Sequence, residues 1–176
     1  MTDNQFCEFV DEMLRSARKA QRQVYNGWEN RDSSEIEDGL AEVGRISDHL
    51  FSNEKKYRDT GNELRTRLKI EDSEFPVVRN KDIRNTIIHI NERRATAYRK
   101  DPRCNTFTNV HFEGISEQAA IRLIDSPAFF RSKFLGQSGE YVVDNDSVNV
   151  YDLLKDLSGL VLRLEPYVDD FPNRIE

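Results

Sequence analysis

Cysteine is scarce in this sequence and long apolar runs are missing, and both shortages exclude whole classes of protein. Only Cys7 and Cys104 occur in 176 residues. Two cysteines are too few for a disulfide framework and lack the spacing of a metal site, so we expect free thiols in a reducing cytoplasm. Neither an 18-residue apolar stretch nor an apolar signal segment after Met1 occurs, which predicts no membrane span and no export.

Glycine-based functional motifs are also missing. The sequence has no glycine-rich phosphate-binding loop, no paired-cysteine metal site and no Gly-x-Ser-x-Gly elbow. This argues against nucleoside triphosphatases and hydrolases built on those motifs, and we predict neither a metal nor a cofactor. Charged residues make up 33% of the chain and hydrophobic residues 37%. These proportions suit one domain over residues 1–176, with a real core and a highly charged surface.

Apolar residues at helical spacing occupy most of the chain. They predict a helix from residue 2 or 3 to about 29, and a helical segment over 34–69 formed by one helix or by two. Further helices are expected from about 80 to 99 and from 150 to about 165, the last stopped by Pro166. The sequence therefore predicts a mainly α fold, an up-and-down helical bundle.

The stretch from about 103 to 149 is less regular. Residues 106–112 favour a short strand, residues 116–124 a helix, and residues 140–150 a β-hairpin. We therefore predict a small β-hairpin insertion, at about 103–149, before the last helix. The tail, from about 168 to 176, is expected to be loose.

The densest group of polar residues lies in the helix predicted after residue 80. One side of that helix is apolar and should face the core, through Ile83, Ile87 and Ile90. Asn85, His89 and Glu92 follow similar spacing along another side. Arg84 lies about 100° around the helix axis from Asn85. Arg84 and His89 would therefore act on one small anion most easily if a second surface closed the gap between them.

These residue types suit cleavage of RNA by its own 2′-oxygen. An imidazole accepts a proton from a ribose hydroxyl near neutral pH, and a guanidinium stabilises charge that develops at phosphorus. Asn85 would orient the imidazole or contact the same phosphate. Such a reaction needs no metal. The competing interpretation is an ordinary solvated helix face, or a helical dimer in which Arg84 and His89 only stabilise the interface.

The segment from Ile83 to Arg93 reads Ile-Arg-Asn-x-x-x-His-x-x-Glu-Arg. Its Arg-Asn-x-x-x-His part resembles the Arg-polar-x-x-x-His motif of the HEPN superfamily. The longer string is similar to that of a subset of uncharacterised bacterial members. The resemblance implies a HEPN-like helical domain and a metal-independent endoribonuclease, as in toxin–antitoxin and antiphage defence systems. It also implies a homodimer, because two copies of the motif form one site in active members. Arg84, Asn85 and His89 would be its catalytic residues, and an antitoxin or regulatory protein would be a further partner.

Basic residues gather around the same motif. The segment from Arg79 to Arg103 holds eight basic and three acidic residues, in a chain of net charge −6. A local basic strip in an acidic protein favours a short phosphate contact over broad duplex binding, with Lys81, Arg93 and Arg94 as candidate RNA contacts. Two alternatives remain open. The basic residues pair with acids elsewhere, or the chain is a non-catalytic HEPN-like module that binds RNA, a nucleotide or a protein.

Overall fold

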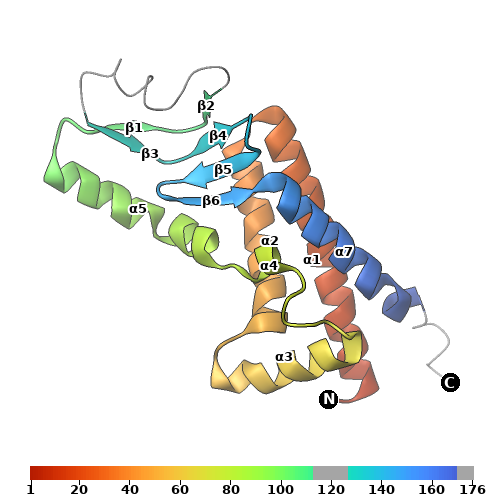
Figure 1. Ribbon diagram of the computed structural model, residues 1–176. Coiled ribbons are helices and arrows are strands. Elements are labelled where there is room, and N and C mark those ends of the chain that lie inside the picture. Colours follow the sequence, from red (N-terminus) through yellow and green to blue (C-terminus); the bar gives the residue numbers. More distant parts are fainter. Residues whose placement is uncertain (113–126, 170–176) are drawn as a thin grey trace.

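Three long helices form the body of the molecule. The computed structural model describes residues 1–112 and 127–169. Helices α1 (Asp3–Asn30), α2 (Ser33–Phe51) and α7 (Val150–Asp169) pack side by side (Figure 1). Both α2 and α7 run antiparallel to α1. Trp28, near the end of α1, contacts Tyr151 at the start of α7, while Phe6, near its start, contacts Tyr167.

The helix ends follow from local hydrogen bonding. Thr2 caps α1, because its side chain accepts a hydrogen bond from the backbone N–H of Gln5 and the Gln5 side chain accepts one from the Thr2 N–H. The carboxylate of Asp32 accepts the N–H groups of Ser34 and Glu35 and so starts α2. The predicted stop at Pro166 is wrong, since α7 continues to Asp169 with this proline inside it. Pro166 removes one backbone donor and its ring crowds the carbonyl four residues earlier, but only three helical residues follow it, so the disturbance is confined to the end of α7.

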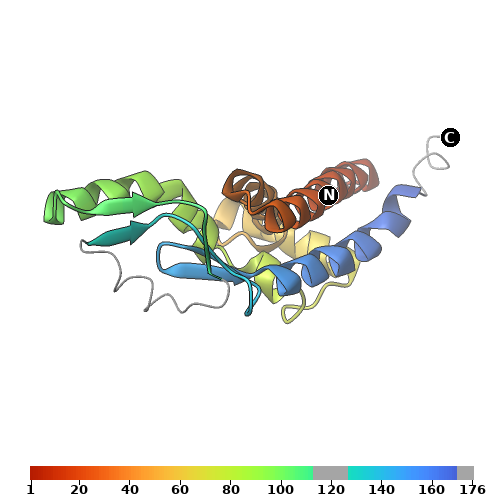
Figure 2. The same cartoon turned by 90° about the horizontal axis from the view of Figure 1, so that it is seen from above.

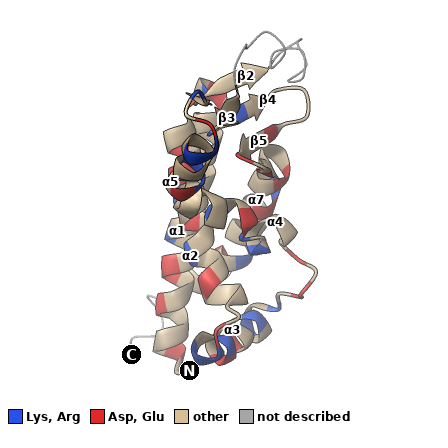
Figure 3. Ribbon diagram, turned by 90° about the vertical axis from the view of Figure 1, so that its left-hand side faces the viewer, with Lys and Arg blue, Asp and Glu red and all other residues tan. Residues whose placement is uncertain are grey.

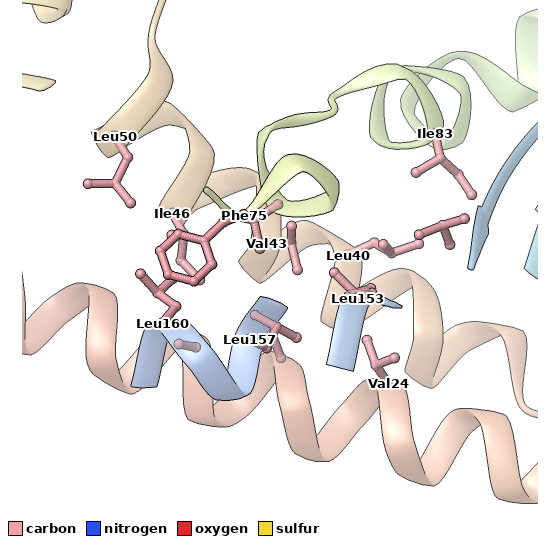
Figure 4. Close-up of a cluster of buried hydrophobic side chains, with 14 of the residues drawn as sticks. Val24, Leu40, Val43, Ile46, Leu50, Phe75, Ile83, Leu153, Leu157 and Leu160 are labelled. Carbon is pink, nitrogen blue, oxygen red and sulfur yellow. The ribbon is translucent and has the colours of Figure 1, made fainter. Parts of the chain in front are cut away.

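The core lies where these helices meet a short fourth element. Figure 4 shows side chains of α2 and α7 around Phe75, with Val24 of α1 in the same cluster, and Leu157 of α7 has no exposed surface. Phe75 has a left-handed backbone (φ 54°), and its ring packs against Gly159, where a Cβ would lie 3.1 Å from Phe75 Cε1. The small α4 (Pro76–Arg79) follows directly. The Asp156 carboxylate accepts the N–H groups of Val77 and Val78, which holds α4 against α7.

The helical segment expected over 34–69 is two helices. Helix α2 ends at Phe51 and α3 (Lys55–Leu68) begins after a break of three residues, then crosses the end of α2 (Figure 1). Helix α5 (Asp82–Lys100) contains the motif and starts beside α2, then extends away from the body (Figures 1 and 2). As predicted, Ile83 and Ile90 are buried and Ile87 packs partly against the core.

Six short strands lie between α5 and α7 in the described residues: β1 (Asn105–Phe107), β2 (Val110–Phe112), β3 (Ala128–Phe130), β4 (Lys133–Leu135), β5 (Glu140–Val143) and β6 (Asp146–Asn149). The strands β2, β4, β5 and β6 form one sheet in that order, and β1 pairs with β3. The β4–β5–β6 pairs are antiparallel, whereas β1–β3 and β2–β4 are parallel. Both parallel pairs have the same offset, since residue 105 lies opposite 128 and residue 110 opposite 133.

The sheet connects the helical body to α5. On the body side, Phe134 is fully buried and its ring centroid lies 5.9 Å from that of Trp28. On the other side, Arg93 of α5 pairs with Asp144 in the β5–β6 turn at 2.9 Å. Through these contacts the sheet packs against the body on one side and against α5 on the other.

The predicted fold is therefore right in class and incomplete in detail. An up-and-down arrangement describes α1, α2 and α7, but α3 crosses them and α5 leaves them. The expected β5–β6 hairpin is present within a larger sheet. The single strand expected over 106–112 is two strands, β1 and β2, and the three-residue strands β3 and β4 were not predicted. The helix expected over 116–124 lies outside the described residues, as do residues 170–176 of the predicted loose tail, while 168 and 169 are helical. None of the described helices combines the length and apolar character needed to cross a bilayer.

One charged group, Glu42 of α2, is buried in the body. Burial disfavours its charged form, but hydrogen bonds from Lys19 and Ser16 and the positive charge of Arg45 outweigh this effect and lower the pKa of Glu42 below 4.5. A carboxylate whose pKa is lower in the folded state than in the unfolded state stabilises the fold at a pH above the unfolded-state pKa. This stabilisation is lost as the pH falls through the folded-state pKa.

We therefore expect Glu42→Gln to lower the free energy of unfolding by about 2 kcal/mol at pH 7, because Lys19 loses a charged partner. The difference from wild type should shrink as the pH falls from 5 to 3. Urea unfolding across that range measures it, with the exposed Asp38→Asn as a control on the same helix. A difference that stays constant with pH would contradict the assignment.

Candidate functional site

Arg84 lies in the first turn of α5 against α2. Its side chain crosses α2 at Gly44, where a Cβ would lie only 2.4 Å from Arg84 Cδ and Nε. Arg84 Nη2 is 3.2 Å from Asp48 Oδ2, and Lys81 Nζ is 2.7 Å from Oδ1 of the same carboxylate. Glycine at position 44 and aspartate one turn later therefore fix the direction of the Arg84 side chain, which is 29% exposed.

His89 lies further along α5 and points to solvent. Its side chain is 57% exposed, and Nδ1 lies 3.3 Å from Glu92 Oε2. Asn85 is exposed on the preceding turn, so the predicted stripe of Asn85, His89 and Glu92 does lie on the outer side of the helix. Within one chain, however, Arg84 is directed to α2 and His89 to solvent. The chain alone does not enclose them in a common crevice.

An apolar residue lies in the middle of this exposed face. Ile88 follows Arg84 by one helical turn and immediately precedes His89, and it is 60% exposed. Such exposure is uncommon for isoleucine beside charged and polar neighbours, although single exposed apolar residues occur on many proteins. The outer face of α5 (Asn85, Ile88, His89 and Glu92) therefore offers one apolar contact surrounded by polar groups.

Two of the three candidate RNA contacts are paired with carboxylates. Lys81 pairs with Asp48, and Arg93 Nη1 lies 2.9 Å from Asp144 Oδ2 and 3.6 Å from Asp146 Oδ2. Arg94 instead contacts Tyr98, with its guanidinium 5.4 Å from the ring centroid. Figure 3 shows both signs of charge on α5. Pairing with acids is therefore the correct interpretation for Lys81 and Arg93, and of the three proposed RNA contacts only Arg94 lacks an acidic partner within the described residues.

Two residues that position Arg84 were missed in the sequence. Gly44 and Asp48 lie one turn apart on α2, about forty residues before the motif. Their spacing places them on one helix face, but sequence alone gives no signal that α5 would cross that face. Only the packing of α5 on α2 reveals the contact.

Gly44→Ala is expected to move Arg84 away from Asp48 while the chain stays folded. The added methyl group clashes with a flexible side chain, and alanine favours a helix over glycine by about 1 kcal/mol. The ¹⁵N–¹H signal of Arg84 Nε should therefore shift, as it should in Asp48→Asn. Ala41→Ser, at an exposed position of the same helix, is the control and should leave the signal in place. An unchanged Arg84 signal in Gly44→Ala would contradict this contact.

No protein-family model, no curated protein and no solved structure matches this chain. The similarity of the Arg84–His89 motif to the HEPN superfamily therefore stays a prediction from about fifteen residues. What the arrangement can do chemically has to be argued from its own geometry.

Proposed function

We propose that this protein is a metal-independent endoribonuclease that works as a homodimer, in the manner of HEPN toxins or antiphage effectors. The proposal depends on one observation: a guanidinium fixed in direction lies within one and a half helical turns of a solvent-exposed imidazole. The ion pair with Asp48 engages Nη2 of Arg84, and a guanidinium has five N–H donors. The donors that Asp48 does not engage would contact the phosphate.

A second copy supplies what one chain lacks. Arg84 and His89 point in different directions, so a surface opposite α5 is needed to close a site around a phosphate. The outer face of α5 supports such a contact, because Ile88 offers apolar surface at its centre. Two such helices packed across a twofold axis would place two copies of His89 near each other.

Each residue then has a distinct role. His89 removes the proton from the ribose 2′-hydroxyl, and the resulting oxygen attacks the adjacent phosphorus. The 5′-oxygen of the next nucleotide leaves and takes a proton, and the product carries a 2′,3′-cyclic phosphate. Arg84 stabilises the charge on the pentacoordinate phosphorus, and Asn85 positions the phosphate or the imidazole. Arg94 is the remaining candidate for a flanking phosphate.

A non-catalytic binding module is the second candidate function. The observation in its favour is that Lys81, Arg84 and Arg93 are already paired with Asp48, Asp144 and Asp146. A substrate phosphate would have to compete with these carboxylates. A module that docks a regulatory protein or nucleotide through the outer face of α5 would not need free cations.

Incubation of the purified protein with RNA in EDTA separates the two candidates. The nuclease should cut RNA without divalent metal and leave 2′,3′-cyclic phosphate ends, whereas a substrate with 2′-deoxyribose at the cleavage position should stay intact. Ile88→Asp should weaken the dimer in sedimentation measurements and lower cleavage with it. The lack of cleavage by folded wild type would reject the nuclease in favour of the binding module.

A further inference from the structure

A cavity of about 200 Å³ lies beside Arg84, between α2, α4, the start of α5 and β6. Most of its wall is aliphatic, from Leu40, Val43, Pro76, Val77, Ile83 and Val148. None of the described residues that line it is aromatic. The cavity therefore offers no ring on which a nucleobase would stack, and its shape favours a compact aliphatic group instead.

Two of the polar residues in the wall are cations, beside the neutral Ser47, Asn80, Ser147 and Asn149. Lys81 and Arg84 both line the cavity, and they share the single carboxylate of Asp48. Two cations that share one carboxylate leave an excess positive charge at this part of the cavity wall. The first turn of α5 adds to it, because helix N-termini have a partial positive charge. A ligand with one negative charge would restore the balance.

Ser47 also lines the cavity. The residue is 1% exposed, and its Oγ has almost no accessible surface and no hydrogen-bond partner among the described residues. A ligand in the cavity therefore does not reach this hydroxyl, and its charge would have to be held by Lys81 and Arg84.

We propose that the cavity binds a short aliphatic carboxylate, with its hydrocarbon part against the valines and leucine and its carboxylate on Arg84. A guanidinium binds a carboxylate through two parallel hydrogen bonds, which matches this residue better than a single point charge would. At about 30 Å³ for each water, the cavity has the space of roughly six or seven waters. An acid with about four to six carbons fills that space.

The ligand would also regulate the site. Its carboxylate competes with Asp48, and with any substrate phosphate, for the Arg84 guanidinium. Inhibition of RNA cleavage by the ligand rests on the proposed ribonuclease function, whereas binding in the cavity does not. The two can therefore fail separately.

A titration of the full chain with a series of acids tests the binding. Acetate, isobutyrate, isovalerate and 4-methylvalerate are added to ¹⁵N-labelled protein, and the amide signals of Ser47, Val77 and Ile83 are followed. Affinity should rise about fourfold for each added CH₂ group. Isovaleramide, which has the same shape without the charge, should bind at least about tenfold more weakly than isovalerate. Equal affinity along the series, or equal binding of the amide, would overturn the proposal.

Variants locate the ligand in the cavity. Val77→Phe places a larger side chain at a partly buried position of the wall and should lower the affinity at least about tenfold. Val161→Phe, at a partly buried valine of α7 away from the cavity, is the matched control. If Val77→Phe does not fold, the amide decides, and equal affinity for isovaleramide and isovalerate would reject the site.

Adding 4-methylvalerate to the RNA cleavage reaction separates the two proposals. Cleavage that the acid inhibits in wild type but not in Val77→Phe supports both. Cavity binding without any RNA cleavage rejects the nuclease and keeps the ligand site. Cleavage without signal changes at the cavity rejects the ligand site and keeps the nuclease, and binding that leaves cleavage unaffected rejects the regulatory link.

Discussion

His89→Ala is expected to lower the rate of RNA cleavage by at least about 10²-fold, because a general base contributes roughly 10² to 10⁴ to such a reaction. Arg84→Ala should lower it by a similar factor, since preorganised donors at a developing oxyanion are typically worth about 10² to 10³. The initial cleavage rate of a defined RNA in EDTA measures both effects. Neither substitution should unfold the chain, because both side chains are partly or largely exposed.

Matched controls exist on other helices. His49 on α2 pairs with Glu12 at 3.6 Å, and Arg15 on α1 pairs with Asp11 at 2.7 Å, so each resembles its counterpart in type and pairing. His49→Ala and Arg15→Ala should keep wild-type cleavage. Full activity in folded His89→Ala or Arg84→Ala would exclude the proposed roles. Equal loss in the controls would trace the loss to general destabilisation and not to the proposed site.

Leu157→Ala should lower the free energy of unfolding by about 2–5 kcal/mol. The Leu157 side chain is fully buried where α7 meets α1, α2 and Phe75, so its truncation removes apolar contacts and leaves a cavity among elements that hold one another in place (Figure 4). Such a loss is a large part of the roughly 5–15 kcal/mol that stabilises a typical domain. Urea denaturation monitored by circular dichroism measures it.

The same helix provides the control. Leu162 lies five residues later on α7 and is 70% exposed. Leu162→Ala makes the same chemical change and should alter the free energy of unfolding by less than about 0.5 kcal/mol. Similar losses in the two variants would mean that α7 does not bury the face described here.

The helices were predictable because their burial is periodic. Ile83, Ile87 and Ile90 identify the inner face of α5 without any knowledge of its partners, and the α7 leucines do the same. The sheet was less predictable, since its three- and four-residue strands pair across long separations in sequence. Local propensity contains little information about such pairing. Helical spacing continues on both sides of the break between α2 and α3, where Phe51 and Leu64 are both buried, so the spacing alone did not decide between one helix and two.

The same distinction between local spacing and long-range packing applies to the candidate site. The exposure of His89 follows from helical spacing, and so does its closeness to Glu92. The pairing of Arg84 and Lys81 with Asp48, and of Arg93 with Asp144, depends on where α2 and the β5–β6 turn lie in space. A count of basic residues along the sequence overestimated the free positive charge for this reason.

The two parallel strand pairs have the same offset in sequence. This requires the connection between β1 and β2 and the connection between β3 and β4, here called the two joints, to have the same length. Residues 108–109 separate β1 from β2, and residues 131–132 separate β3 from β4. One residue inserted at either joint alone would shift one pair relative to the other and turn a strand's side chains to the opposite face. An insertion at both joints would keep the two pairs aligned. Chains that share this sheet should therefore gain or lose residues at the two joints together.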